Sequence, residues 1–407
     1  MKNVSLWPSK SPPNYPITHS LTNLSRSPRA STWHQLPPTK GFAARIVVPL
    51  FSSQYRTNMT QHCLLRCLTQ HDSLEELYEP SEEAPLLDDT AKASHLWRAP
   101  KLKTSFSAKE FLSLFHAHFK LAAPLLFHHL RQTIFHLPAD TYNPLFTRRL
   151  KPVSNLGFSG STFFLTQPPK LLIKSVGRRF EYTFLYTQLI EAYHKYLRGN
   201  HSQHSETFLC QITDVVYSFN FRLGEALGIS PGHYLVMRNI LERPGYEKWD
   251  LKPSGFFEPT RDLVPDDMKS GQAKSGLADE LPEDMRITLA AKDREIVLER
   301  LRKDTNWLCE MATIDYSLLL GRWKAEEYGD EEEGQEGEWR SPDGRWVYRM
   351  ALVDYLWNVE QLRPKIMQTA GMLLPEQTVT TEPERYRDEF MKMMEEYVKV
   401  WEEEDAE

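Results

Sequence analysis

Two short apolar runs on either side of a proline turn form the clearest pattern along the chain. Residues 163–165 and 171–173 are apolar, and Pro168 and Pro169 separate them. Apolar β-forming runs around such a turn predict a β-hairpin. Lys174 directly follows the second run, so we expect it at the end of the returning strand.

A small turn, Ser159-Gly160-Ser161, precedes this hairpin. Because no bulky side chain blocks the approach, the backbone N–H groups of such a turn can lie against phosphate oxygens. Lys174 can reach the same phosphates, which is the division of labour that kinases use. An ordinary hairpin with an incidental lysine is the alternative for this stretch taken alone.

Apolar periodicity predicts the other main elements. Helical spacing covers residues 124–131, 179–197, 292–310 and the stretch from 383 onwards, and β-like runs cover 209–217, 234–241 and 345–356. Met237 and Asn239 end one such run and suit a hinge beside an adenine ring, although a plain buried strand fits equally. Glu181, early in the second helix, is a candidate partner for Lys174, with a solvated surface glutamate as the alternative.

Polar residues in three later stretches suit phosphoryl transfer. Asp250 and Lys252 alternate, so on an extended segment they point to the same side. A surface ion pair is the alternative reading of these two residues. Asp315 lies between apolar residues, and a nearly buried carboxylate needs partners or a task. Asp354, near the end of the run 345–356, suits a carboxylate that holds Mg²⁺ against nucleotide phosphates.

Composition narrows the possible classes of protein. The 407 residues are 41% hydrophobic and 12% aromatic, which indicates a globular chain, and the net charge of -6 argues against a dedicated nucleic-acid binder. No apolar run approaches the roughly 20 residues that span a bilayer. The four cysteines show no CxxC spacing, which favours reduced thiols and no zinc site.

Residues 1–95 differ in composition from the rest. No acidic residue precedes Asp72, and prolines interrupt any helical pattern, so we expect a basic, then acidic, disordered extension. A mitochondrial transit peptide is the alternative, since such segments are basic and poor in acids.

The motifs SGSTFF with IKS, WDLKPSG, IDYSLLLG and VDYL, in this order, resemble the catalytic core of the phosphatidylinositol phosphate kinase family. Members of that family carry an SGSxFF loop, an IKT lysine and DLKGS, MDYSLL and IID segments. The resemblance covers roughly residues 105–400. It implies a two-lobed α+β fold similar to protein kinases and the SAICAR-synthase-like group, with antiparallel sheets and flanking helices. The expected lobes are residues 105–240 and 241–400.

The resemblance also implies how ATP and Mg²⁺ are bound. Ser159, Gly160 and Ser161 match the family's phosphate loop, and Lys174 matches its nucleotide lysine. Asp354 matches the metal aspartate of the IID segment.

The catalytic positions follow in the same way. Asp250 and Lys252 match the acid and base of DLKGS, and Asp315 matches the aspartate of MDYSLL. The implied activity is transfer of the ATP γ-phosphate to a phosphatidylinositol phosphate headgroup by a cytoplasmic enzyme, peripheral at membranes and possible as a homodimer.

Two departures from the family pattern affect the expected substrate. Pro253 replaces a glycine in DLKGS, and residues 369–381 contain no lysine or arginine where family members carry a lysine-rich loop. We therefore expect weak attraction to anionic vesicles. An inactive phosphoinositide-binding scaffold and a soluble inositol-phosphate or other small-molecule kinase are the alternative functions.

Overall fold

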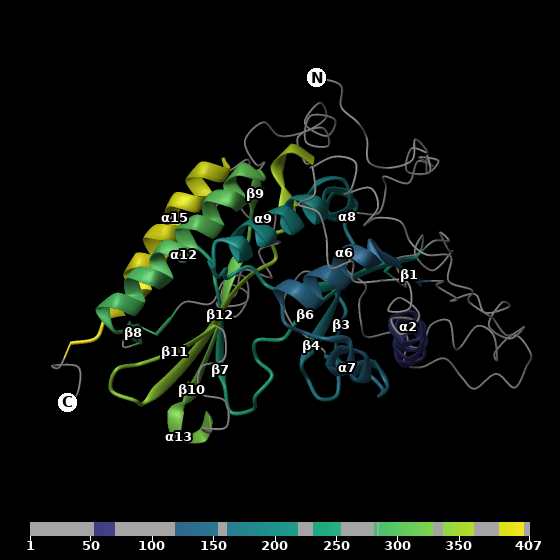
Figure 1. Ribbon diagram of the computed structural model, residues 1–407, viewed down its shortest axis with the longest axis horizontal. Helices are drawn as coiled ribbons and strands as arrows, with labels where there is room; N and C mark the ends of the chain where they lie inside the picture. Colours follow the sequence, from purple (N-terminus) through teal and green to yellow (C-terminus); the bar gives the residue numbers. More distant parts are fainter. Residues whose placement is uncertain are drawn as a thin grey trace, which may run out of the picture.

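The computed structural model describes residues 53–69, 119–153, 161–218, 231–253, 281–282, 285–328, 337–361 and 382–402. Ten of the described strands form two antiparallel sheets with helices on their flanks, and the other four form two small two-stranded sheets (Figure 1). This mixed α+β architecture confirms the fold class that the motifs implied.

The first sheet has six strands in the order β1-β5-β6-β4-β3-β2. Their bounds are β1 Phe119–Ala122, β2 Lys151–Val153, β3 Phe163–Leu165, β4 Leu171–Ser175, β5 Ile212–Ser218 and β6 His233–Arg238. The predicted hairpin is β3 and β4, with Phe163 opposite Lys174 in register. The apolar strand β6 lies in the interior of the sheet, and its four central residues are buried.

Alternation along β4 decides where its lysine points. Leu171 and Ile173 are buried, whereas Leu172 and Lys174 are only partly buried. Because successive side chains of a strand point to opposite faces, Lys174 lies on the face opposite Ile173. The apolar residues thus anchor the strand and leave the lysine directed away from the core beneath it.

Helical segments of the first half surround this sheet. They are α6 Pro124–His129, the π-helical turn η3 Leu130–Ile134, α7 Ala139–Tyr142, the 3₁₀ turn η4 Asn143–Phe146, α8 Arg179–Phe184, the π-helical turn η5 Leu185–Leu189 and α9 Ile190–Ser202. Segments α8, η5 and α9 are continuous, which confirms the helix predicted over 179–197 and extends it.

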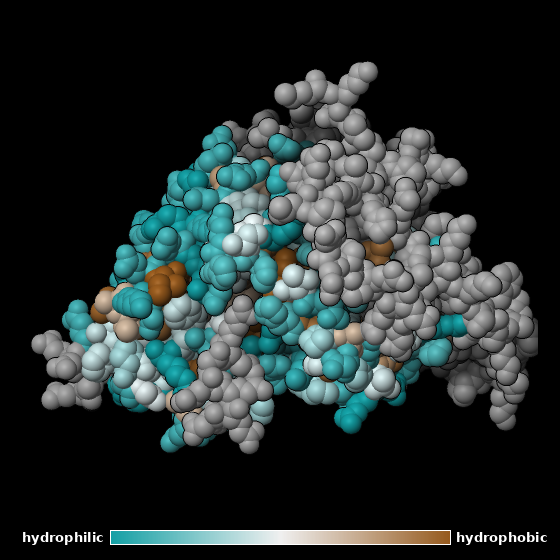
Figure 2. Space-filling model, viewed as in Figure 1, coloured by the Kyte–Doolittle hydropathy of each residue, from teal (hydrophilic) through white to brown (hydrophobic). Residues whose placement is uncertain are grey.

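The second sheet has four strands in the order β11-β12-β10-β7. The second half contains β7 Glu247–Leu251, β8 Ile287–Leu289, β9 Thr313–Ile314, β10 Ser317–Lys324, β11 Glu338–Arg340, β12 Trp346–Val353, β13 Trp357–Asn358 and β14 Val398–Val400, with helices α12 Ala291–Glu310, α13 Ala325–Tyr328 and α15 Pro383–Tyr397. Helices α12 and α15 run side by side next to this sheet (Figure 1). Their outer side is mostly hydrophilic, as amphipathic helices on a core require (Figure 2).

One hydrophobic core joins the two sheets. It extends from Leu235 of the first sheet to Leu318 and Leu352 of the second. The connection after β6 packs closely on β10, because a side chain added at Gly321 would come within 2.6 Å of Leu241 and of the Trp323 ring. The two sheets are therefore held at a fixed junction, and the site described below lies on both of them.

Helix α2, Ser53–Leu68, corrects part of the expectation for the N-terminal region. Its residues Cys63, Leu64, Cys67 and Leu68 are buried in a core with β1 and β4 residues. Arg149 Nε also donates a hydrogen bond of 2.8 Å to Gln61 Oε1. Over residues 53–69 the expected disorder is thus wrong, because a stripe of buried apolar side chains fixes the helix. The other residues of 1–95 lie outside the described part.

Across the described ranges, no helix combines the length and the apolar character that crossing a bilayer requires.

Candidate functional site

The ends of two strands from different sheets meet at an ion pair. Lys174 Nζ, at the end of β4, contacts Asp354 Oδ1, directly after β12. The ion pair holds Asp354 in place, and 39% of its side-chain surface is exposed to solvent. The carboxylate is therefore fixed by the fold and still accessible to a ligand.

Electrostatics keep this carboxylate ionised. Burial alone would raise the pKa of Asp354, but the charges of Lys174, Lys252 and Arg178 lower it below its ordinary value. An ionised, accessible carboxylate beside a lysine suits the binding of a hydrated divalent cation next to phosphate oxygens.

A second lysine–aspartate pair lies in the same neighbourhood. Lys252 Nζ, directly after β7, is 2.8 Å from Asp315 Oδ1, in the turn between β9 and β10. Burial alone would lower the pKa of Lys252, but the carboxylates of Asp315, Asp250 and Asp354 raise it. Since Asp354 acts on both lysines, the two pairs form one electrostatic site.

Both paired aspartates have an unusual backbone conformation. Asp315 has φ +62° and Asp354 has φ +64°. Positive φ is uncommon for residues other than glycine, although Asp and Asn tolerate it better than most, and it costs conformational energy. At Asp315 and Asp354 this conformation turns the chain sharply where each acid meets its lysine.

Asp315 is more accessible than its sequence context predicted. Its neighbours Ile314 and Tyr316 are buried, but 37% of the Asp315 side chain is exposed. The expectation of a nearly buried carboxylate was therefore wrong. The sharp turn sends the apolar neighbours into the core and the acid towards solvent.

Asp250 joins this site from β7, where it lies opposite Leu319 of β10. Its charge contributes to the raised pKa of Lys252. The structure thus brings together Lys174, Asp354, Lys252, Asp315 and Asp250, which the sequence distributes over 180 residues.

The connection after β6 links the two sheets, as the hinge prediction requires. Met237 is 8% exposed and lies opposite Leu172 in register. Asn239 Nδ2 donates a hydrogen bond of 2.7 Å to the Pro169 carbonyl, and its backbone N donates one of 2.9 Å to the Lys170 carbonyl. Asn239 therefore fastens the hinge to the turn of the β3–β4 hairpin. Contact of Met237 and Asn239 with adenine stays a prediction.

Glu181 does not bond Lys174 in this structure. Its carboxylate accepts hydrogen bonds from the backbone N of Arg178 at 3.3 Å and from Arg178 Nη1 at 3.5 Å, at the start of α8. Burial raises the pKa of Glu181, and the nearby charges of Arg178 and Lys174 oppose this rise. Lys174 contacts Asp354 instead, so the candidate Lys174–Glu181 pair is not formed.

Only the end of the predicted phosphate loop is described. Ser159 and Gly160 lie outside the described residues, whereas Ser161 lies within them. Next to it, the Thr162 backbone N donates a hydrogen bond of 2.7 Å to Ser175 Oγ on the strand of Lys174. The loop is thus fastened beside the lysine at its C-terminal end, and its contact with phosphate stays a prediction.

The donor set fits Mg²⁺ only in part. Among the described residues, no group of three or more Asp, Glu, His or Cys side chains forms a metal cage. However, Mg²⁺ is usually held by one or two carboxylates together with water and substrate phosphates. The exposed carboxylates of Asp354 and Asp315 fit this mode, in which the nucleotide supplies the remaining ligands.

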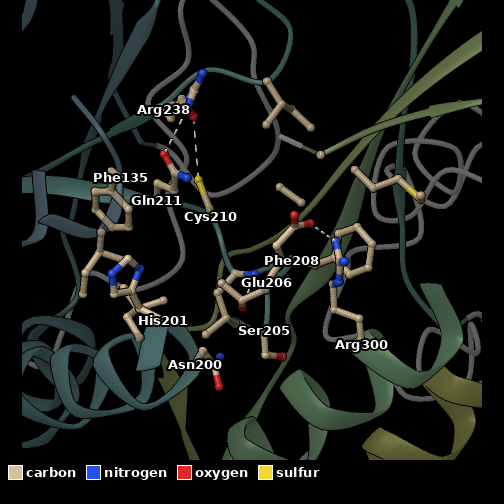
Figure 3. Close-up of a pocket in the computed structure, with 18 of the residues that line it drawn as sticks. Phe135, Asn200, His201, Ser205, Glu206, Phe208, Cys210, Gln211, Arg238 and Arg300 are labelled. Carbon is tan, nitrogen blue, oxygen red and sulfur yellow. Dashed lines mark hydrogen bonds and ion pairs between the residues drawn. The ribbon is translucent and has the colours of Figure 1, made fainter. Parts of the chain in front are cut away.

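A separate cavity of about 110 Å³ lies behind the hinge (Figure 3). Phe208 and Cys210 line it, with Arg238 on one side and Arg300, paired to Glu206 at 2.6 Å, on the other. Of its described lining residues, none belongs to the two lysine–aspartate pairs. The cavity therefore adjoins the hinge without being part of the phosphoryl-transfer site.

Sequence reasoning missed the acid that fixes the chain segment lining this cavity. Asp304 on α12 is fully buried and accepts hydrogen bonds from Tyr196 Oη at 2.6 Å, Thr207 Oγ1 at 2.7 Å and the Phe208 backbone N at 2.6 Å. The spacing of Asp304 after Leu301 places it on the buried side of the helix, which was the available signal.

Comparison with known proteins agrees with this geometry. Residues 145–338 match the protein family described as Phosphatidylinositol-4-phosphate 5-Kinase. This part of the chain is therefore similar to phosphatidylinositol phosphate kinases. The match includes Lys174, Lys252 and Asp315, whereas Asp354 lies beyond its C-terminal end.

Several curated proteins are similar to this chain at modest identity. Phosphatidylinositol 4-phosphate 5-kinase its3 of Schizosaccharomyces pombe is 26% identical over 207 residues, covering 50% of this chain and 26% of the relative. Phosphatidylinositol 5-phosphate 4-kinase type-2 gamma is 27% identical over 258 residues in Pongo abelii and 26% identical over 258 residues in Homo sapiens, each covering 61% of this chain and 54% of the relative. The chain thus spans between about a quarter and just over half of these relatives.

Proposed function

We propose that this protein transfers the γ-phosphate of ATP to a hydroxyl of a phosphatidylinositol phosphate headgroup. The observation that carries the proposal is the convergence of two lysine–aspartate pairs at one accessible site between two sheets. The kinase-domain match supports the choice of reaction. Both the relatives named 4-phosphate 5-kinase and those named 5-phosphate 4-kinase are similar, so the proposal leaves the phosphorylated position open.

Lys174 and Asp354 act on the nucleotide in this proposal. The Lys174 ammonium neutralises phosphate charge, while the ionised Asp354 carboxylate holds Mg²⁺. Bound Mg²⁺ supplies positive charge that stabilises the phosphoryl group during transfer. The loop residues Ser159, Gly160 and Ser161 cover the phosphates, and Met237 and Asn239 border the adenine.

The acceptor side is formed by Asp315, Asp250 and Lys252. Asp315 or Asp250 takes the proton of the attacking hydroxyl, and Lys252 holds the Asp315 carboxylate in place at 2.8 Å. The hydroxyl oxygen forms a bond to the γ-phosphorus as the bond to the β,γ-bridging oxygen breaks and ADP leaves. Positioning and charge stabilisation supply most of the rate increase.

We also propose a peripheral location at the cytoplasmic surface of a membrane, with weak attraction to anionic lipid. The weak attraction is inferred from residues 369–381, which carry no basic side chain and lie outside the described part of the chain. A homodimer stays a prediction that the structure of one chain does not test.

The test incubates the purified full chain with Mg-ATP and vesicles that contain phosphatidylinositol 3-, 4- or 5-phosphate. We expect a bisphosphate product from at least one of them, and the identity of the isomer gives the position phosphorylated. Soluble inositol phosphates serve as parallel substrates. Turnover of these alone would support a soluble kinase, and lipid binding without turnover of any substrate would support a scaffold; either result contradicts the proposal.

A further inference from the structure

Arg178 is a third cation close to the Lys174–Asp354 ion pair. It follows Lys174 by four positions, and Trp357 follows Asp354 by three. The Arg178 guanidinium lies over the Trp357 ring, 5.0 Å from its centroid. The contact between Arg178 and Trp357 therefore joins the same two chain segments as the Lys174–Asp354 ion pair.

The ring beneath Arg178 is itself held in place. Phe180, the second residue of α8, packs edge-on against Trp357 with 5.0 Å between ring centroids. Trp357 belongs to β13, which pairs with β9, the strand that precedes Asp315. The platform under the guanidinium is thus built from the elements that position both aspartates.

The guanidinium has donor capacity available for a ligand. Within the described part of the chain, its one ion pair is with Glu181, at a long 3.5 Å, and 44% of its side chain is exposed. A guanidinium carries five N–H donors in a planar fork that matches phosphate oxygens. Lys174 and Lys252, in contrast, each already contact an aspartate.

The charge balance of the site also favours a further cation for binding a triphosphate. Asp354, Asp315, Asp250 and Glu181 bring negative charge to the site, and a nucleotide triphosphate adds more. Because Lys174 and Lys252 are each paired with an aspartate, they leave part of this added charge uncompensated. Arg178 also acts on the Asp354 carboxylate. Burial raises the pKa of Asp354, whereas Lys174 and Lys252 lower it, and Arg178 lowers it further by a smaller amount.

We propose that Arg178, which lies over the Trp357 ring, binds the terminal phosphate of the nucleotide beside the Lys174–Asp354 pair. This inference rests on the proposed kinase function, and it assigns a binding residue that none of the sequence motifs contains. A stacked, solvated surface arginine with no contact to ligand is the competing explanation.

The test compares nucleotide binding by Arg178→Gln and Arg179→Gln in the full chain without vesicles. Arg179 is adjacent, exposed and equally charged, so its variant controls for a general loss of positive charge. Hydrogen bonds to charged groups contribute on the order of 1.5–3 kcal/mol, so Arg178→Gln should weaken Mg-ATP binding at least about tenfold. Mg-ADP lacks the terminal phosphate, and its binding should change less than about threefold.

Two further variants separate direct contact from a structural effect. Arg178→Lys keeps the charge without the planar fork, so it should restore Mg-ATP affinity only in part. Trp357→Phe keeps an aromatic ring and removes an indole N–H that is buried without a partner in the described part of the chain. This variant should stay folded, with an intermediate loss of Mg-ATP affinity and unchanged Mg-ADP affinity.

The outcomes separate this inference from the proposed function. Equal effects of Arg178→Gln and Arg179→Gln, or equal weakening of ATP and ADP, would overturn the role of Arg178 and leave the kinase proposal intact. A wild-type protein that binds neither nucleotide would overturn both. Selective loss of Mg-ATP affinity in Arg178→Gln supports the inference whichever lipid proves to be the acceptor.

Discussion

Asp354 and Asp304 are two carboxylates that the fold treats in opposite ways. Asp354 faces Lys174, keeps 39% of its side chain exposed and has a lowered pKa because its cationic neighbours outweigh burial. Asp304 is fully buried and accepts three hydrogen bonds, from two hydroxyl groups and a backbone N–H. Burial raises the pKa of Asp304 to about 6, although these donors and Arg300 oppose the rise.

The contrast separates an acid that serves a ligand from one that serves the scaffold. An exposed ion pair adds little to stability because water solvates the separated charges almost as well. A buried acid with several donors ties chain segments together, and removing it leaves those donors unsatisfied. We therefore expect substitutions around Asp354 to affect activity and those at Asp304 to affect stability.

Replacing Lys174 with methionine should have the largest effect on activity. Loss of a cation that neutralises phosphate should cost on the order of 3 kcal/mol or more in the transition state, a fall in turnover of roughly 150-fold or more. The fold should persist, because Lys174 lies on the face of β4 opposite the buried Ile173. Steady-state kinetics and thermal melting measure the two effects. A Lys174→Met protein with normal rates would remove Lys174 from the site.

Asp354→Asn tests the ligand-binding side of the comparison directly. Asparagine is nearly isosteric and tolerates positive φ, so the turn at φ +64° should be kept and unfolding free energy should change by less than about 1 kcal/mol. Loss of the carboxylate should raise the Mg²⁺ concentration for half-maximal activity at least about tenfold. Titration of activity with Mg²⁺ measures this change. An unaltered Mg²⁺ dependence would place the metal on other residues.

The sequence predicted the individual strands and turns of this site, but not which of their side chains contact each other. The β3–β4 hairpin, the end of β12 and the places of Lys174 and Asp354 follow from apolar runs and turn residues. The contact between these two residues, 180 positions apart, depends on how the two sheets pack. The positive φ of Asp315 was equally invisible, and for that reason its exposure was underestimated.

The errors in scaffold regions have a different physical origin. The prolines and the lack of acidic residues in 1–52 indicate disorder, but they say nothing about α2, whose short apolar stripe packs on the core. At Asp304, an acidic residue interrupts the buried stripe of α12, and only its three donors on other segments explain its presence. Packing between distant segments determines both the order of α2 and the burial of Asp304. The periodicity along a single segment does not reveal such packing.

Leu64→Ala extends the comparison to the scaffold. Leu64 is fully buried between α2 and the first sheet, so its truncation should lower the free energy of unfolding by about 3 kcal/mol. Chemical denaturation measures this change. Substitution of the exposed Asn58 on the same helix by alanine is the control, with little expected effect. If the two variants were equally stable, α2 would not pack on the core in solution.

Asp304→Asn should lower stability no more than Leu64→Ala does, and its effect should depend on pH. The asparagine satisfies the three donors less well, so the variant should lose about 1–3 kcal/mol of stability. The folded-state pKa of Asp304, about 6, lies above its ordinary value of 3.8, so stability is lost as pH rises between these two values.

The stability of the wild type relative to Asp304→Asn should therefore increase as pH falls from about 7 to 4, by about 2 kcal/mol or less. The buried His194 and the partly buried His233, whose pKa values are lowered to about 4 mainly by burial, destabilise both proteins in acid and cancel in the difference. Paired denaturation curves across this range measure the difference. A stability difference that stays constant with pH would mean that Asp304 is ionised throughout, and the contrast with Asp354 would then be one of exposure alone.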